Sequence, residues 1–354
     1  MAKDDWAVVV GVRLYPDLGD LDGPENDARS FYAWLTDPAG GDVPKEQTAL
    51  ILSSDFAPAP VPNRAEPTTL RVQQAFEDLQ DVADQSQQAG NGRRVGRRLY
   101  IYLSGHGCAP RLNDSALLTA NATKLRPGYH IIGKLYADWF LRSNFFDQAV
   151  LFMDCCRESY PQAPPNIPPY IDVTGPDALD KTRTFYGFGT KWSRLSRERL
   201  MPDGLTHGIF TWAILAGLKG GACDPNTGQI TAATLGNFLY NRMKAFLTPD
   251  ELADPDVPKE PDLQYDQTPN NPIIFNTLAV PKYPVTINLP AAIAGQQVQI
   301  LSDKLQMVIA AAAKPPLWQL ELKAGTYLAQ AMAAGLQTPA FEVSGTEAVN
   351  VFFQ

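Results

Sequence analysis

Four short apolar runs in the first half of the chain alternate with longer amphipathic stretches, and this alternation constrains the fold most strongly. The predicted strands are residues 6–12, 48–54, 97–107 and 148–156. The predicted helices are residues 25–37, with Asn26 as a candidate N-cap, 68–88, with Thr68 as the N-cap, and 131–143. Strands that alternate with helices predict an α/β fold: a mainly parallel central sheet with helices on both faces.

The pattern breaks after Cys156 and then resumes. Residues 160–183 are rich in proline and form a predicted loop, of a length that is usually functional or mobile. A strand at 184–190, helices at 207–219 and 231–247 and a short strand at 272–276 follow, with a polar, proline-rich stretch at 249–272. The α/β domain is therefore expected to extend over residues 1–278.

The last part of the chain has a different character. From about residue 280, apolar or alternating runs of strand length lie between glycine and proline turns, and helical patterns are nearly absent. Residues 281–354 are predicted to form a small all-β sandwich of the immunoglobulin-like or prealbumin-like kind.

Composition excludes several classes of function. The net charge is −8 and no run of Lys or Arg is present, which argues against nucleic acid as a partner. The most apolar stretches have strand length, so no membrane-spanning helix is predicted. The N-terminus turns acidic at once and lacks a signal-peptide pattern, which predicts a cytoplasmic location. The spacing of the four cysteines fits neither a disulfide framework nor a zinc site.

Reactive side chains stand where two predicted strands end. His106 ends one strand, and the pair Cys155 and Cys156 ends another. In open parallel sheets, functional sites collect beyond the carboxyl ends of the strands. Side chains alternate along a strand, so Asp154 and Cys156 are predicted to face one way and Cys155 the other. The spacing of 50 residues between His106 and Cys156 matches the caspase arrangement.

These motifs resemble the caspase-like cysteine peptidases, specifically the metacaspase and bacterial caspase-like (orthocaspase-type) branch, over residues 6–276. The matching segments are "YLSGHG", "DCC", "GPENDA", "THGIFTWAIL" and "YDQTPNNPIIF". The resemblance implies a caspase-like sandwich with a large-subunit-like part (1–160), a linker (160–183) and a small-subunit-like part (184–278). It also implies a dyad of His106 and Cys156, with the backbone amides of Gly107 and Cys156 as oxyanion hole.

The resemblance extends to a pocket for the substrate. Asp27, Ser104 and Asp154 match the specificity pocket of metacaspases, although Pro24 stands where these carry a cysteine. Paired carboxylates would bind Arg or Lys and repel Asp. The alternative roles are a helix N-terminal acid for Asp27 and a strand-end cap for Asp154. Trp192 is predicted to line the cleft or to pack on the surface, and His130 and His207 are predicted to be non-catalytic, the first at the surface or as a cap and the second packed.

The predicted function is a cysteine endopeptidase that cleaves protein or peptide substrates after Arg or Lys, in a regulated bacterial stress, cell-death or antiviral defence pathway. Activation is expected by a cut near Lys181 or Arg183, made by the enzyme itself or an upstream protease. The acid cluster that binds calcium in many metacaspases is missing, with Ala163 at one of its positions, so no metal or other cofactor is expected. The alternatives are a catalytically idle interaction module and a peptidase that cleaves after Asp.

Overall fold

The computed structural model describes residues 2–59, 61–111, 114–159, 163, 165–170, 182–191, 197–255, 257–266, 271–280, 282–303, 305–323, 325–343 and 349–353. The chain divides into two compact units. The first unit contains Met1–Cys223 and Ile230–Asn276, and the second contains Asp224–Gln229 and Thr277–Gln354. Each unit has a hydrophobic core of its own.

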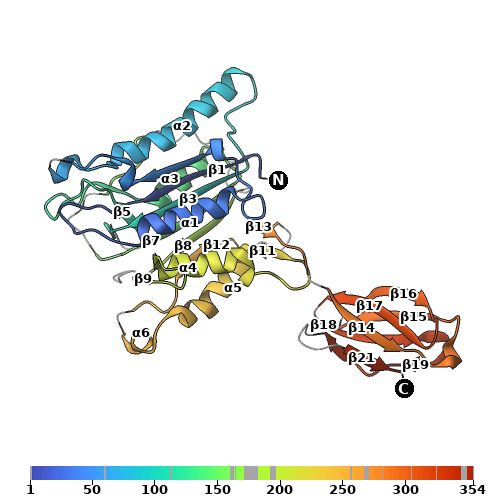
Figure 1. The fold of residues 1–354 in the computed structure, drawn as a ribbon. Helices are drawn as coiled ribbons and strands as arrows, with labels where there is room; N and C mark the ends of the chain where they lie inside the picture. Colours follow the sequence, from blue (N-terminus) through green and yellow to red (C-terminus); the bar gives the residue numbers. More distant parts are fainter. Residues whose placement is uncertain are drawn as a thin grey trace. The chain divides into compact units, whose positions relative to one another are not determined.

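A six-stranded sheet with the order β12-β8-β7-β3-β1-β2 forms the centre of the first unit (Figure 1). Its strands are β1 (Asp5–Gly11), β2 (Thr48–Leu52), β3 (Arg98–Gly105), β7 (Gln148–Cys155), β8 (Arg183–Phe188) and β12 (Asp262–Tyr265). Neighbouring strands are parallel except for β12, which runs antiparallel to β8 at the edge. The predicted, mainly parallel sheet is confirmed.

Helices cover both faces of this sheet. On one face, α2 (Thr69–Gln88) and α3 (Gly133–Arg142) pack in one core with alternate strand residues such as Ile101 and Leu151. On the other face lie α1 (Pro24–Thr36) and α4 (Ile209–Ala216). There Phe31 of α1 stacks on Tyr102, and the Tyr102 hydroxyl shares a 2.6 Å hydrogen bond with Thr211 of α4. Alternate residues of β3 and β7 therefore contact different helices.

The helix starts follow from local chemistry. Thr68 caps α2 as predicted, because its side chain accepts a hydrogen bond from the Arg71 amide. The prediction that Asn26 caps the first helix is wrong. The helix α1 starts at Pro24, whose fixed φ suits a first helical position, and no side chain caps it. The Asn26 amide instead donates to the carbonyls of Asp22 and Thr206.

Several short elements were not predicted. His207 lies in the hairpin of β9 (Glu198–Leu200) and β10 (Thr206–Gly208), and not in a helix. The predicted helix 207–219 is shortened to α4 and ends in a π-helical turn, where Gly220 has φ 131°. The stretch 249–272 contains a helix, α6 (Pro249–Ala253), and the edge strand β12.

The other strands and α-helices described before residue 280 complete this part of the chain. They are β4 (Gly107–Cys108), β5 (Ala116–Leu118), β6 (His130–Ile131), β11 (Gln229–Thr231), α5 (Ala232–Arg242) and β13 (Ile274–Thr277).

The second unit is rich in antiparallel strands. Its strands are β14 (Lys282–Asn288), β15 (Gln297–Ser302), β16 (Met307–Ala312), β17 (Leu317–Lys323), β18 (Gly325–Ala331), β19 (Leu336–Gln337), β20 (Phe341–Val343) and β21 (Val349–Phe352). They form a three-stranded and a five-stranded sheet, as expected for a sandwich. One pair, β14 with β21, is parallel.

None of the helices in the described residues has both the length and the apolar character that a membrane span requires.

Candidate active site

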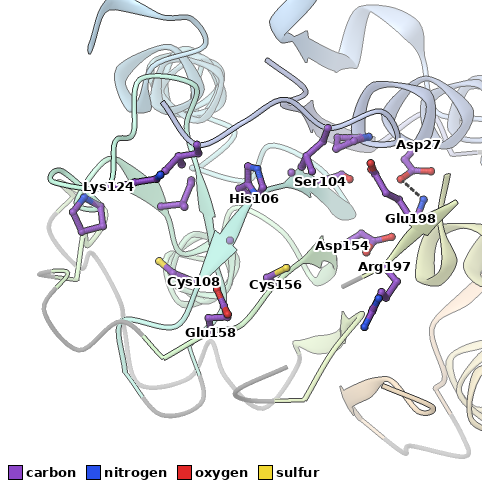
Figure 2. Close-up of a pocket in the computed structure, with 18 of the residues that line it drawn as sticks. Asp27, Ser104, His106, Cys108, Lys124, Asp154, Cys156, Glu158, Arg197 and Glu198 are labelled. Carbon is purple, nitrogen blue, oxygen red and sulfur yellow. Dashed lines mark hydrogen bonds between the residues drawn. The ribbon is translucent and has the colours of Figure 1, made fainter. Parts of the chain in front are cut away.

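The carboxyl ends of β3 and β7 border a pocket of about 520 Å³ (Figure 2). His106 follows β3, Cys156 follows β7, and both line the pocket. The two strands are parallel neighbours, with Ser104 paired to Asp154. Because the strands end in register at one edge of the sheet, two residues far apart in the sequence meet at one cavity.

The two adjacent cysteines have opposite environments. The Cys155 side chain is 1% exposed and packs in the core on the α2 and α3 side, with its Sγ 3.5 Å from the Ser115 hydroxyl. Burial raises the pKa of the Cys155 thiol above its usual range. Cys156 is half-buried and lines the pocket, as does Asp154 (Figure 2). The alternation of side chains thus leaves one thiol of the pair at the cavity.

Two groups that the sequence did not indicate hold His106. The Tyr15 hydroxyl accepts a 3.0 Å hydrogen bond from the His106 amide and donates to the Leu118 carbonyl, and the two rings meet edge to face. The Gly19 carbonyl lies 2.9 Å from His106 Nε2. A carbonyl can only accept, so Nε2 carries a proton, and the basic nitrogen of that tautomer is Nδ1.

The backbone segments after His106 and after Cys156 are tied together. The Ala109 amide donates to the Glu158 carbonyl at 2.8 Å. Gly107 lies in the first of these segments and approaches the second closely. A Cβ at Gly107 would lie 2.5 Å from the Cys156 carbonyl oxygen and 2.7 Å from Cys155 Cβ. A residue without a side chain is therefore required after the histidine.

Three predicted pocket residues, Asp27, Ser104 and Asp154, all line the cavity, and their side chains are buried (Figure 2). Asp154 Oδ2 accepts from the amide and the hydroxyl of Thr211, at 3.0 and 2.7 Å. Asp27 lies in the first turn of α1, and its Oδ2 accepts from the Gly208 amide at 2.9 Å. The structure thus brings two carboxylates from different elements to one end of the pocket.

Asp27 also contacts His207, a residue predicted to be packed and non-catalytic. Its Oδ1 lies 2.7 Å from Nδ1 of His207, which is 1% exposed. Burial raises the pKa of Asp27 to about 7 against the lowering effect of this hydrogen bond, and the charge of Asp154 adds to the rise. Burial lowers the pKa of His207, but the hydrogen bonds and charges of Asp27 and Asp203 outweigh it, so that the pKa is raised overall.

Other charged groups complete the lining. Glu198 of β9 accepts from the amides of Asp22 and Gly23, and thereby ties the hairpin to the start of α1. Arg197 also lines the pocket and forms an ion pair with Asp254. Lys124 lies at the opposite end from the two aspartates (Figure 2). In the part of the chain that the structure describes, no cluster of His, Cys, Asp and Glu could hold a metal ion.

Two of the predicted residues, Trp192 and Lys181, lie outside the described residues. Arg183 is the first residue of β8, and its amide donates to the Asp147 carbonyl at 2.9 Å. The prediction of a surface or capping role for His130 is wrong. Its side chain is fully buried in β6, with Nδ1 2.8 Å from the Pro127 carbonyl.

A family model, described as Caspase domain, matches residues 4–270. The chain belongs to the caspase-domain family. Among solved structures, caspase-1 from Spodoptera frugiperda is similar with 14% identity over 78% of this chain and 93% of that chain, at a TM-score of 0.46. A protein of Geobacter sulfurreducens is similar with 16% identity over 75% and 94%, at a TM-score of 0.43. No curated protein matches the chain significantly.

This caspase domain contains the whole pocket, because every residue that lines it lies between Leu18 and Gly208. The family consists typically of cysteine peptidases, and a cysteine and a histidine share the pocket described above. The second unit lies almost entirely outside the matched residues.

Proposed function

We propose that this protein is a cysteine endopeptidase of the metacaspase or bacterial caspase-like branch that cleaves proteins after Arg or Lys. The observation that carries the proposal is the shared pocket: Cys156 and His106 stand beside two buried carboxylates, Asp27 and Asp154. A regulated bacterial stress, cell-death or antiviral defence pathway is the setting that we infer for such an enzyme.

The dyad would work through His106 Nδ1. A free cysteine has a pKa near ~8.5, so a neighbouring base must help to form the thiolate. Because Nε2 is engaged by the Gly19 carbonyl, Nδ1 accepts the Cys156 proton. The sulfur then attacks the carbonyl carbon, and His106 gives the proton to the leaving amine. Water hydrolyses the thioester and returns the proton through the same histidine.

The backbone amides of Gly107 and Cys156 are our candidates for the oxyanion hole. A donor of this kind typically contributes about 3–4 kcal/mol to the transition state. Two features of the structure support the pair. Gly107 has no side chain to obstruct the approach of the carbonyl, and the backbone around it is held by the Ala109 and Glu158 hydrogen bond.

The charge of the pocket supports a preference for substrates with a basic residue before the cleaved bond. Asp27, Asp154 and Glu198 line the pocket, and carboxylates bind guanidinium and ammonium groups while they repel carboxylates. Arg197 also faces the pocket, but its ion pair with Asp254 offsets its charge. Asp154 is our first candidate for contact with the substrate cation. It precedes Cys156 by two residues, so the two side chains face the same way, toward the pocket.

The test uses peptides that differ only in the residue before the scissile bond. We expect cleavage after Arg and Lys, and none after Asp. Removing the carboxylate from a desolvated carboxylate–cation pair costs about 2–5 kcal/mol of binding free energy. Asp154→Ala should therefore lower kcat/KM for Arg peptides by about 30-fold to several thousandfold. Equal turnover of Arg and Asp peptides would contradict the specificity, and absence of turnover with intact Cys156 would favour an idle interaction module.

A further inference from the structure

The buried histidine His207 lies between two carboxylates and is not one of the residues that line the pocket. It belongs to β10, and its Nδ1 lies 2.7 Å from Asp27 Oδ1 while its Nε2 lies 3.0 Å from Asp203 Oδ2. The Asp203 side chain is 40% exposed, whereas the imidazole is 1% exposed. The ring of Trp212 packs beside it, with the ring centroids 5.4 Å apart. These contacts fix the orientation of the imidazole.

Both ring nitrogens donate when Asp27 and Asp203 are ionised. An ionised carboxylate can only accept, so each of the two contacts requires a proton on the nitrogen it meets, and a ring with both protons is an imidazolium. The raised pKa of His207 agrees with this assignment. One imidazolium between two ionised carboxylates gives the group of three a net charge of −1, so this end of the pocket stays negative.

The same end of the hairpin lies close to the second carboxylate, Asp154. A Cβ at Gly208 would lie 3.0 Å from Asp27 Oδ2 and would overlap Asp154 Oδ2. The two carboxylates therefore lie on either side of the Gly208 position, with Asp27 held by His207 and Gly208, and Asp154 held by Thr211. The other charged groups on the elements around them are Glu25 and Arg29 of α1, Arg197 just before β9, and Glu198 and Arg199 of β9. Arg199 is the cross-strand partner of His207 and forms an ion pair with Glu251.

Without the imidazolium, this arrangement would be unfavourable. Asp27 is 1% exposed and has Asp154 as a neighbouring negative charge. Two buried carboxylates in one site cannot both stay ionised unless a cation or several donors compensate them. The Gly208 amide is a single neutral donor. A neutral Asp27 would attract a cationic side chain far less than an ionised one.

We propose that His207 is a positioning residue that keeps Asp27 ionised and oriented, and so makes this end of the pocket selective for a guanidinium or amidinium group. The inference rests on the proposed function, since it concerns the pocket for the basic residue of the substrate. His207 acts through Asp27 and does not contact the substrate. Asp203 supports the same arrangement from the exposed side.

The test measures binding, so it does not depend on turnover. Benzamidine and its neutral isostere benzamide are titrated by calorimetry into the full-length Cys156→Ala protein at about pH 8. With His207 intact, this protein should bind benzamidine at least about tenfold more tightly than benzamide, and the variants below are made in the same Cys156→Ala background. His207→Leu should remove most of this preference, and His207→Asn, whose side-chain amide can still donate to Asp27, should retain part of it. His130→Asn, at another buried histidine, is the matched control and should leave the preference unchanged.

Melting temperatures separate this role from a loss of folding. If His207→Leu does not fold, His207→Asn and Asp203→Asn decide the question, and each should reduce the preference with the fold intact. Unchanged preference in the folded variants, or a Cys156→Ala protein with intact His207 that does not distinguish the two compounds, overturns the inference. A wild type that binds benzamidine in a His207-dependent way but cleaves no Arg peptide would defeat the peptidase proposal alone. Cleavage of Arg peptides with no dependence of binding on His207 would defeat this inference alone.

Discussion

At the scale of single residues, the chemistry depends on which thiol reaches the cavity. Cys155 and Cys156 are neighbours in sequence, yet one packs in the core and the other lines the pocket. Burial also raises the pKa of Cys108, which lines the pocket too, to about 12. A thiol with so high a pKa has almost no thiolate at neutral pH and is a poor nucleophile.

We therefore predict that a peptide chloromethyl ketone ending in Arg labels Cys156. Mass spectrometry of the digested protein should find the adduct on the peptide that contains Cys156, and Cys156→Ala should abolish both the adduct and the peptidase activity. Cys155→Ala should keep a substantial part of the activity, since it deletes one buried sulfur from the core at a cost of about 1 kcal/mol. An adduct and an activity that depend on Cys155 instead would overturn the assignment.

Asp27 predicts a pH dependence of cation binding. Its pKa in the folded protein is raised to about 7, so the carboxyl takes up a proton as the pH falls through that value. Protonation removes a negative charge from the pocket. In the Cys156→Ala protein, the affinity for benzamidine, which stays cationic throughout, should fall as the pH is lowered from about 8.5 to about 5.5. Benzamide serves as the control that should show no such trend, and a flat benzamidine curve would contradict the prediction.

At the scale of elements, the sequence predicted what depends on local pattern. The apolar runs that became β1, β3 and β7 place His106 and Cys156 at strand ends, and alternation along β7 separates Cys155 from Asp154. The hairpin β9 and β10 was missed because strands of three residues have too little pattern. Gly19 acts through its backbone carbonyl, which leaves no side-chain signal, and the contact of Asp27 with His207 joins residues 180 positions apart.

We predict proteolytic processing in residues 160–183, the segment that the sequence predicts to be a linker. Arg183 pairs with Gln148 in the sheet, so a cut after Arg183 would require β8 to release its first residue. Of the two candidate sites we therefore expect the cut after Lys181. Gels and peptide assays should show a processed, active wild type and an unprocessed, less active Lys181→Ala/Arg183→Ala variant, with Arg183→Ala alone still processed. A fully active wild type that stays a single chain, matched by the double variant, would show that processing is not the switch.

At the scale of the whole molecule, the residues of the candidate site and those of the second unit come from different parts of the sequence. Every residue that lines the pocket belongs to the first unit, and the core of the second unit contains residues from Val285 to Val351 alone. Units with separate cores can in principle fold alone. The segment Asp224–Gln229 is the one part of the second unit that precedes Thr277 in the sequence, and its neighbours on both sides belong to the first unit.

We predict that a chain ending at Asn276 keeps kcat/KM for Arg peptides within about threefold of the full-length protein, because the truncation removes no group of the pocket. Its melting temperature should fall slightly. The Asn226 carbonyl loses a hydrogen bond from Lys323 and the Gly228 carbonyl loses one from Leu278, and each such bond contributes about 0.5–1.5 kcal/mol. The comparison needs both chains at equal concentrations of titrated active site. A loss of activity beyond about tenfold in a truncated chain that remains folded would mean that the C-terminal unit takes part in catalysis or in substrate binding.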